Sequence, residues 1–228
     1  HVDLTKKKVL KIIDEGGFSK NLDVGYFDGE RIDSLKPTLP APEPLQIIQP
    51  KGKTFTVKGH KITWQNWELR YGINNKEGLV LYDVKYIDQG KKRSVMYRGS
   101  LAEMVVPYGA PKLDEASNNF FDVGEFRLGQ RSAKPLNPGA DAPENAAYFP
   151  AIMHDDNGKP FEVPNAVALY EEYGGPQWRH GNSARRATNL ALKYFTRIGN
   201  YDYGFKWTFH EGGEISVDVE MTGIVHID

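Results

Sequence analysis

Short runs of β-branched and aromatic residues, each followed by residues that favour turns, are the feature that most constrains how this chain can fold. Such runs follow one another closely at 55–57, 61–65, 68–73, 79–87, 93–98 and 101–108. Two of the stretches between them, 74–78 (Asn-Asn-Lys-Glu-Gly) and 88–91 (Asp-Gln-Gly-Lys), have the composition of hairpin connections. The pattern predicts strands that pair with their neighbours in the sequence.

The strand pattern returns after residue 160, and helical periodicity is nearly absent. Strand-type runs lie at 165–171, 190–198, 203–210 and 214–221, whereas 109–160 is richer in Gly, Pro and Asn and holds one candidate helical turn at 123–128. The chain has 228 residues, of which 39% are hydrophobic and 12% aromatic, so it is large enough to bury a core. These features predict a mainly β protein, an antiparallel β-sandwich of stacked sheets with short helices.

The first 45 residues differ from the rest in composition. Residues 1–14 predict two short strands around a polar turn, and 15–45 lose periodicity and contain several Gly and Pro residues, as is typical of a linker. We therefore predict two parts, 1–45 and 46–228, of which the second is the β domain. The chain begins with His1 rather than Met, inside a strand-like run, which indicates a piece of a longer protein.

Composition excludes several classes of function. The net charge is −1, so no excess of positive charge draws the chain to nucleic acid or to an anionic membrane surface. Its apolar stretches are far shorter than the roughly 20 residues of a membrane span. The absence of cysteine excludes disulfides, thiolate zinc sites and a cysteine nucleophile. The sequence contains no phosphate-binding loop, dinucleotide fingerprint or G-x-S-x-G motif.

The six histidines are too widely spaced to form a metal-binding pair within one strand or helix. They are His1, His60, His154, His180, His210 and His226. His210 and His226 could meet across strands, but a lone strand histidine is more often a solvated or hydrogen-bonded side chain. Residues 154–158 (His-Asp-Asp-Asn-Gly) resemble part of a calcium loop without its distal Glu, so a hairpin turn is favoured. The glycine pairs at 174–175 and 212–213 are also predicted to lie in turns.

Among the carboxylates, Asp122 has an unusually apolar setting, with two phenylalanines before it and Val-Gly after it. Burial there would raise the pKa of its carboxyl toward the range of a catalytic base. The alternative is an N-cap of the candidate helical turn, because Glu125 has a spacing like that of a capping box. From these residues alone the cap is favoured. Glu171 and Glu172 are predicted to point to opposite faces of a strand, with no special role.

Several motifs, in the same order along the chain, resemble the copper amine oxidase family. Residues 196–203 (Thr-Arg-Ile-Gly-Asn-Tyr-Asp-Tyr) are similar to the family's Asn-Tyr-Asp/Glu-Tyr motif, whose first tyrosine becomes topaquinone. The others are 64–67 (Trp-Gln-Asn-Trp), 97–109 (Tyr-Arg-Gly-Ser-Leu-Ala-Glu-Met-Val-Val-Pro-Tyr-Gly) and 121–125 (Phe-Asp-Val-Gly-Glu). The resemblance implies that 46–228 is the N-terminal portion of the family's catalytic β-sandwich, and that 1–45 ends the preceding small α/β domain and includes its linker.

The resemblance assigns a role to each matching position. Tyr201 matches the topaquinone precursor, and Asn200 matches its ordering neighbour. Asp122 matches the catalytic base, which reverses the preference for a helix cap. Tyr108 matches the tyrosine that hydrogen-bonds the quinone, and Phe120 stands where the family has an aromatic gate at the mouth of the substrate channel.

The resemblance also implies a parent protein that oxidises a primary amine, with O2 and water, to an aldehyde, ammonia and hydrogen peroxide. Its implied features are Cu2+ and topaquinone as cofactors, an aromatic or arylalkyl amine as substrate, a homodimer, and a periplasmic or extracellular location. The family's His-x-His copper pair lies several dozen residues after the cofactor tyrosine, whereas this chain ends 27 residues after Tyr201. We therefore expect neither cofactor in this chain alone. The alternative function is a non-enzymatic β-sandwich that binds ligands or partners, if the natural protein lacks the copper ligands.

Overall fold

The computed structural model describes residues 2–10, 39–40, 42–43, 45–107 and 119–224, and it divides the chain into two units, 1–43 and 44–228. In the first unit, β1 (Val2–Asp3) pairs with β2 (Lys8–Val9), as the two predicted short strands require. The Asp3 carboxylate accepts the backbone N–H groups of Thr5 and Lys6 at 3.0 Å, which closes the turn between them. Most of the predicted linker lies outside the described residues, and the assignment of 1–45 to a preceding domain stays a prediction.

The second unit contains two large antiparallel sheets. The first has the order β3-β4-β5-β6-β7, so each strand pairs with its neighbour in sequence. Its strands are β3 (Thr56–Lys58), β4 (Lys61–Trp64), β5 (Trp67–Asn74), β6 (Gly78–Asp88) and β7 (Lys91–Gly99). The two hairpin connections predicted at 74–78 and 88–91 join β5 to β6 and β6 to β7.

The second sheet has the order β11-β12-β13-β14-β15, with β10 (Ala133–Lys134) beside β13. Its longer strands are β11 (Ala147–His154), β12 (Pro160–His180), β13 (Ser183–Ile198), β14 (Tyr201–His210) and β15 (Ile215–Gly223). A separate small ladder joins β8 (Val105–Pro107) to β9 (Asn119–Phe121), and β9 leads directly into α1 (Asp122–Glu125).

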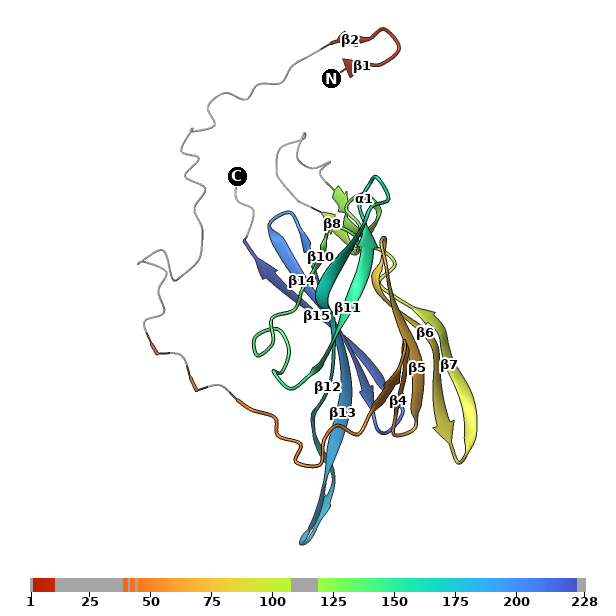
Figure 1. Cartoon of the computed structure of the whole chain (residues 1–228), viewed down its shortest axis with the longest axis vertical. Helices are drawn as coiled ribbons and strands as arrows, with labels where there is room; N and C mark the ends of the chain where they lie inside the picture. Colours follow the sequence, from red (N-terminus) through yellow and green to blue (C-terminus); the bar gives the residue numbers. More distant parts are fainter. Residues whose placement is uncertain (1, 11–38, 41, 44, 108–118, 225–228) are drawn as a thin grey trace. The chain divides into compact units, whose positions relative to one another are not determined.

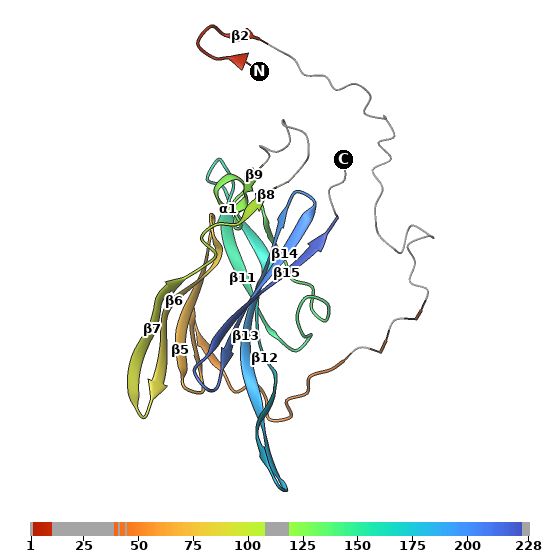
Figure 2. The ribbon, with the colours of Figure 1, turned by 180° about the vertical axis from the view of Figure 1, so that it is seen from behind.

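The two large sheets face each other around one apolar core, as Figures 1 and 2 show from opposite sides. The Trp67 ring of β5 meets the Phe209 ring of β14 with centroids 5.3 Å apart, and Tyr71 meets Phe149 of β11 at 5.8 Å. The Trp67 indole N–H also donates to the His210 carbonyl at 2.7 Å, so this buried polar group is satisfied. The mainly β, antiparallel sandwich predicted from the sequence is thus confirmed, and within the described ranges no helix is long and apolar enough to cross a membrane.

Several predicted boundaries were wrong. In the described part of the run at 101–108, residues 101–107, only the three-residue strand β8 forms. The strand β11 was missed because its region is rich in turn-forming residues. The pair Gly174-Gly175 lies inside β12, not in a turn, at register shifts between Tyr173 and Trp178. Glycine suits both a turn and a bulge, because each can need a positive φ, and Gly175 has φ +84°. The hairpin at 154–158 was correct: the Asp155 carboxylate accepts the N–H groups of Asn157 and Lys159.

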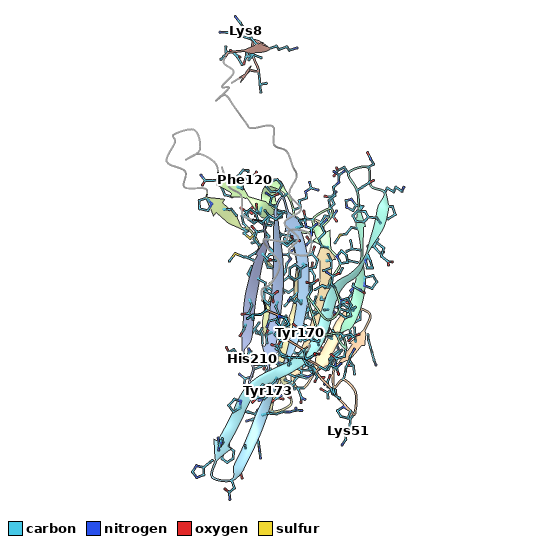
Figure 3. All side chains as sticks on the ribbon, turned by 90° about the vertical axis from the view of Figure 1, so that its left-hand side faces the viewer. Lys8, Lys51, Phe120, Tyr170, Tyr173 and His210 are labelled. Carbon is cyan, nitrogen blue, oxygen red and sulfur yellow. The ribbon has the colours of Figure 1, made fainter. Side chains whose placement is uncertain are left out.

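The far ends of β12 and β13 form a two-stranded ribbon that extends beyond the sandwich, and residues 173–186 are here named the arm. Figure 1 shows the ribbon projecting from the sheets, and Figure 3 places Tyr173 near its base. Tyr173 is 71% exposed and Trp178 is 51% exposed, although both lie in strands. Pairing continues to the tip, where His180 faces Ser183.

At the base of the arm, Glu171 contradicts the expectation that it has no special role. Its side chain is buried and accepts hydrogen bonds from the Trp64 indole at 2.9 Å, the Gln49 amide at 2.5 Å and both the backbone N–H and the hydroxyl of Thr54. Burial on its own would raise the pKa of Glu171, but these donors outweigh it and lower the pKa. Glu171 therefore fastens the chain before β3 to the second sheet.

Candidate functional site

Asp122 is the first residue of α1 and is only 3% exposed. Its backbone N–H donates to the Met104 carbonyl at 2.9 Å. The residue at the N-cap position is Phe121, whose side chain makes no capping hydrogen bond. The interpretation of Asp122 as an N-cap was therefore wrong, and its carboxyl is left for another role.

The N–H groups at the start of α1 are instead accepted by Glu103, from the segment before β8. The Glu103 carboxylate accepts from Val123 at 2.8 Å and from Gly124 at 3.1 Å, and it also accepts from Met104 at 2.9 Å. Desolvation would raise the pKa of Glu103, but these backbone donors lower it overall. Sequence reasoning missed this residue, because its partners lie about 20 positions away and local spacing gives no sign of them.

The environment of Asp122 raises the pKa of its carboxyl. Burial is the main cause, and the negative charges of Glu103 and Glu125 add to it. Glu125 turns back to accept the backbone N–H of Phe121 at 3.0 Å. A buried carboxyl with this shift is suited to taking and holding a proton.

Tyr201 begins β14 directly after the β13–β14 turn, where it pairs with Ile198 on one side and Gly223 on the other. It is half-buried against the main core. Asn200 lies exposed in the turn, and its carbonyl accepts the backbone N–H of Ile224 at 2.8 Å. Gly223 has φ +111°, and a Cβ there would lie 2.3 Å from the Asn200 oxygen, so this close approach requires glycine.

Tyr203 interacts with both Asp122 and Tyr201. The rings of Tyr201 and Tyr203 have centroids 6.3 Å apart, because residues two apart on a strand share one face. Burial raises the pKa of Tyr203, and the charges of Asp122 and Tyr201 raise it further. Asp122 and Tyr201 thus both act on one buried tyrosine, Tyr203, which sequence reasoning had not singled out.

Phe120 lies on β9, opposite Val106 of β8 and two residues before Asp122. It is half-buried, and its ring centroid is 6.1 Å from that of Phe126. Figure 3 shows it at the end of the sandwich opposite the arm. Tyr108 lies outside the described residues, so its predicted contact with a quinone stays a prediction.

The described residues do not form a copper site. No group of three or more His, Asp or Glu side chains in the described ranges is arranged to hold a metal ion. His154 contacts the Asn75 amide, and one ring nitrogen of His210 lies 2.8 Å from the Ser216 hydroxyl. His1 and His226 lie outside the described residues. Tyr201, in contrast, fits the precursor of a protein-derived quinone, because it lies half-buried on the strand face that also faces the raised-pKa carboxyl of Asp122.

A cavity of about 210 Å³ lies farther along β14, on the same face as Tyr203. Its lining is mostly apolar and consists of Glu77, Leu79, Ser100, Leu101, Phe205, Trp207, Val217 and Val219. Its one carboxylate, Glu77, already accepts from Arg98, Ser100 and Asn74, and the Arg98 hydrogen bonds lower its pKa to about 2. An amine entering this cavity would therefore meet a carboxylate that is already fully paired.

The sandwich is that of a known enzyme class. Residues 56–228 match the family model "Copper amine oxidase, enzyme domain", and the chain therefore belongs to the copper amine oxidase family. It is 37% identical to a primary amine oxidase of Klebsiella aerogenes and 36% identical to a histamine oxidase of Arthrobacter globiformis, each over 98% of this chain. These alignments span 29% and 33% of the two relatives, so the chain covers about a third of their length.

Solved structures agree with this assignment. A copper-containing benzylamine oxidase from Hansenula polymorpha superposes with a TM-score of 0.76 at 33% identity, over 85% of this chain and 31% of that one. An amine oxidase from Aspergillus nidulans gives a TM-score of 0.73 at 28% identity, over 82% of this chain and 26% of that one. The second unit thus has the fold of part of a copper amine oxidase.

Proposed function

We propose that this chain is part of a primary amine oxidase, to which it contributes the catalytic base Asp122 and the quinone precursor Tyr201. The whole protein would convert a primary amine, O2 and water into an aldehyde, ammonia and hydrogen peroxide. The observation that carries the proposal is the buried Asp122 carboxyl, whose pKa is raised and which acts electrostatically on Tyr203, the neighbour of Tyr201 on β14.

The chemistry divides between the cofactor and this chain's own side chains. A quinone derived from Tyr201 would supply the carbonyl group that takes up electrons from the amine. Asp122 would remove the proton from the carbon that bears the nitrogen, and its raised pKa suits it to hold that proton afterwards. Phe120 would limit the access of water and substrate, Asn200 would order the cofactor, and Tyr108 would hydrogen-bond it. Copper would need ligands from outside the described residues.

The central test is Asp122→Asn in the full-length parent. Quinone formation should persist, while bleaching of the quinone's visible band by an arylalkyl amine under anaerobic conditions should slow by about 10²–10⁴-fold, as expected for a lost general base. The control is Asp218→Asn on β15, which should leave the bleaching rate unchanged; the Asp218 carboxylate lies 3.7 Å from the ammonium group of Lys206 on β14. Bleaching at the wild-type rate in Asp122→Asn would refute the role of Asp122.

A second test uses the chain by itself. A neutral tyrosine, whose ordinary pKa is about 10, is unreactive toward O2 unless a metal withdraws charge from its oxygen. We therefore expect Tyr201 to stay unmodified when the chain is incubated in air with copper, which mass spectrometry of the peptide 200–206 would check. An added oxygen on Tyr201, or steady peroxide release with an amine, would show that the chain binds copper after all.

We further propose that the parent is a homodimer in which the arm contacts the second copy. Its exposed aromatic residues, Tyr173 and Trp178, gain little from the core of their own chain, and aromatic side chains are enriched in protein interfaces. An aromatic or arylalkyl amine is the proposed substrate, and export to the periplasm or beyond stays a prediction.

A further inference from the structure

We propose that Glu103 is a positioning residue for Asp122: it accepts the N–H groups at the start of α1 and so leaves the Asp122 carboxyl available to the Tyr201–Tyr203 face. This inference rests on the proposed function of Asp122 as the base. Glu103 acts through α1 and not through contact with the substrate.

The first step is geometric. The first N–H groups of a helix need acceptors, and a short acidic side chain at the helix start commonly supplies one. Here Glu103 does so from another segment, at 2.8 Å from Val123 N and 3.1 Å from Gly124 N. Gly124 suits this approach, because a Cβ there would lie only 3.1 Å from Glu103 Oε2. Because Glu103 supplies this acceptor, α1 does not need the Asp122 carboxyl for it.

The same carboxylate fastens two segments together. Glu103 accepts the N–H of the next residue, Met104, at 2.9 Å, and the Met104 carbonyl in turn accepts the N–H of Asp122 at 2.9 Å. These bonds fix the backbone on both sides of Asp122 to the segment before β8. The position of Asp122 relative to β14 is therefore set by contacts from outside α1.

The second step is electrostatic. The backbone donors around Glu103 lower its pKa and so favour its charged form, and that negative charge is one of the causes that raise the pKa of Asp122. Opposite shifts in neighbouring carboxyls are the usual way in which one is kept as an acid–base group. In the described part of the chain, the other titratable groups acting on Asp122 or on its neighbours are Glu125 of α1, Tyr203 and Tyr201 of β14, and Lys76, which faces Glu103.

The test is a titration of Asp122 by ¹³C-carboxyl NMR in this chain, with Asp122→Asn to assign the signal. Glu103→Gln keeps an oxygen that can accept the Val123 N–H but removes the charge, so the pKa of Asp122 should fall. Glu125→Gln should lower it less, since Glu125 is the weaker of the two charges, and Glu211→Gln, at the other end of β14, should not change it. The fall should be larger at low salt, because added ions screen an exposed charge.

A merely structural role of Glu103 would leave the pKa of Asp122 the same in Glu103→Gln and Glu211→Gln. Unfolding tests the hydrogen bonds of Glu103 separately. Glu103→Ala removes both the charge and the acceptor, so its urea midpoint should fall, and Glu103→Gln should restore most of that loss. The proposal is overturned if Asp122 titrates alike in Glu103→Gln and Glu211→Gln, or if Glu103→Ala unfolds like the wild type. Because the titration needs neither copper nor quinone, it can fail while the Asp122→Asn test of amine oxidation succeeds, and the reverse.

Discussion

The ends of β12 and β13 that lie between the sheets, here named the base, differ in structure from the arm, which continues the same two strands. In the base, Leu169 of β12 faces Leu192 of β13, and both are fully buried between the sheets. In the arm, the same pairing continues to Arg179 and Ala184, but both of these residues are exposed. Backbone pairing therefore extends well beyond the core that stabilises it. Since a lone two-stranded ribbon is only marginally stable in water, we expect the arm to gain its order from a partner.

Glu171 marks the boundary between the two regions. It is the last buried residue of β12 before the arm, and its donors come from Gln49, Thr54 and Trp64. Beyond it most residues of β12 are exposed. Mutations on the two sides of Glu171 should therefore differ in what they change: the free energy of unfolding toward the base and self-association toward the tip.

The largest effect is expected in the base, for Leu192→Ala. Removing a fully buried leucine forfeits its transfer free energy and leaves a cavity, so the free energy of unfolding should fall by about 3 kcal/mol, within the usual 2–5. Urea unfolding of the isolated chain would measure it. Leu192→Met is the matched control and should lose less than about 1.5 kcal/mol. A loss below 1 kcal/mol for Leu192→Ala would mean that the base is not a packed core.

The next effect is expected at Glu171→Ala, which leaves the Trp64 indole and the Thr54 N–H without their acceptor. We expect a loss of about 2–3 kcal/mol at neutral pH. Because the folded-state pKa of Glu171 is lowered, its ionised form stabilises the fold above the ordinary value of 4.5 and that stabilisation is lost as the pH falls through the lowered value. The difference from wild type should therefore narrow below about pH 4.5, and a constant difference from pH 7 to pH 3 would contradict this account.

The contrast between base and arm also shows what the sequence could predict. Alternating apolar residues located most strands of the base, because burial of one face imposes that pattern. The arm follows no such pattern, because both faces of its ribbon are exposed, as the neighbours Trp178 and Arg179 show. Its glycines were interpreted as a turn, whereas they form a bulge. At the candidate site, Asp122 and Tyr201 were predicted from local motifs and from the family resemblance. Tyr203 and Glu103 act through contacts between distant segments, which no local spacing reveals.

A smaller effect is expected at Gly175→Ala, at the bulge where the base gives way to the arm. Gly175 has φ +84°, and no atom lies within 4 Å of an added Cβ, so any loss comes from backbone strain alone. That strain amounts to roughly 1–2 kcal/mol. Gly212→Ala is the control, because its φ is not positive and it also faces open space. Equal stability of the two variants in thermal unfolding would show that the bulge is not fixed in the free chain.

The smallest effect on unfolding is expected at the tip, for Trp178→Ala. The side chain is half-exposed, so the free energy of unfolding should change by less than about 0.5 kcal/mol. If the arm contacts a second copy, the same change should weaken dimerisation of the full-length parent by at least tenfold, because buried tryptophans dominate interface energies at 2 kcal/mol or more each. Sedimentation at several concentrations would measure this, with Tyr97→Ala as the control, since Tyr97 is 84% exposed on β7 and outside the arm. Equal dissociation constants for both variants would separate the arm from the dimer, and a loss of folding stability in Trp178→Ala would instead make the arm an extension of the core.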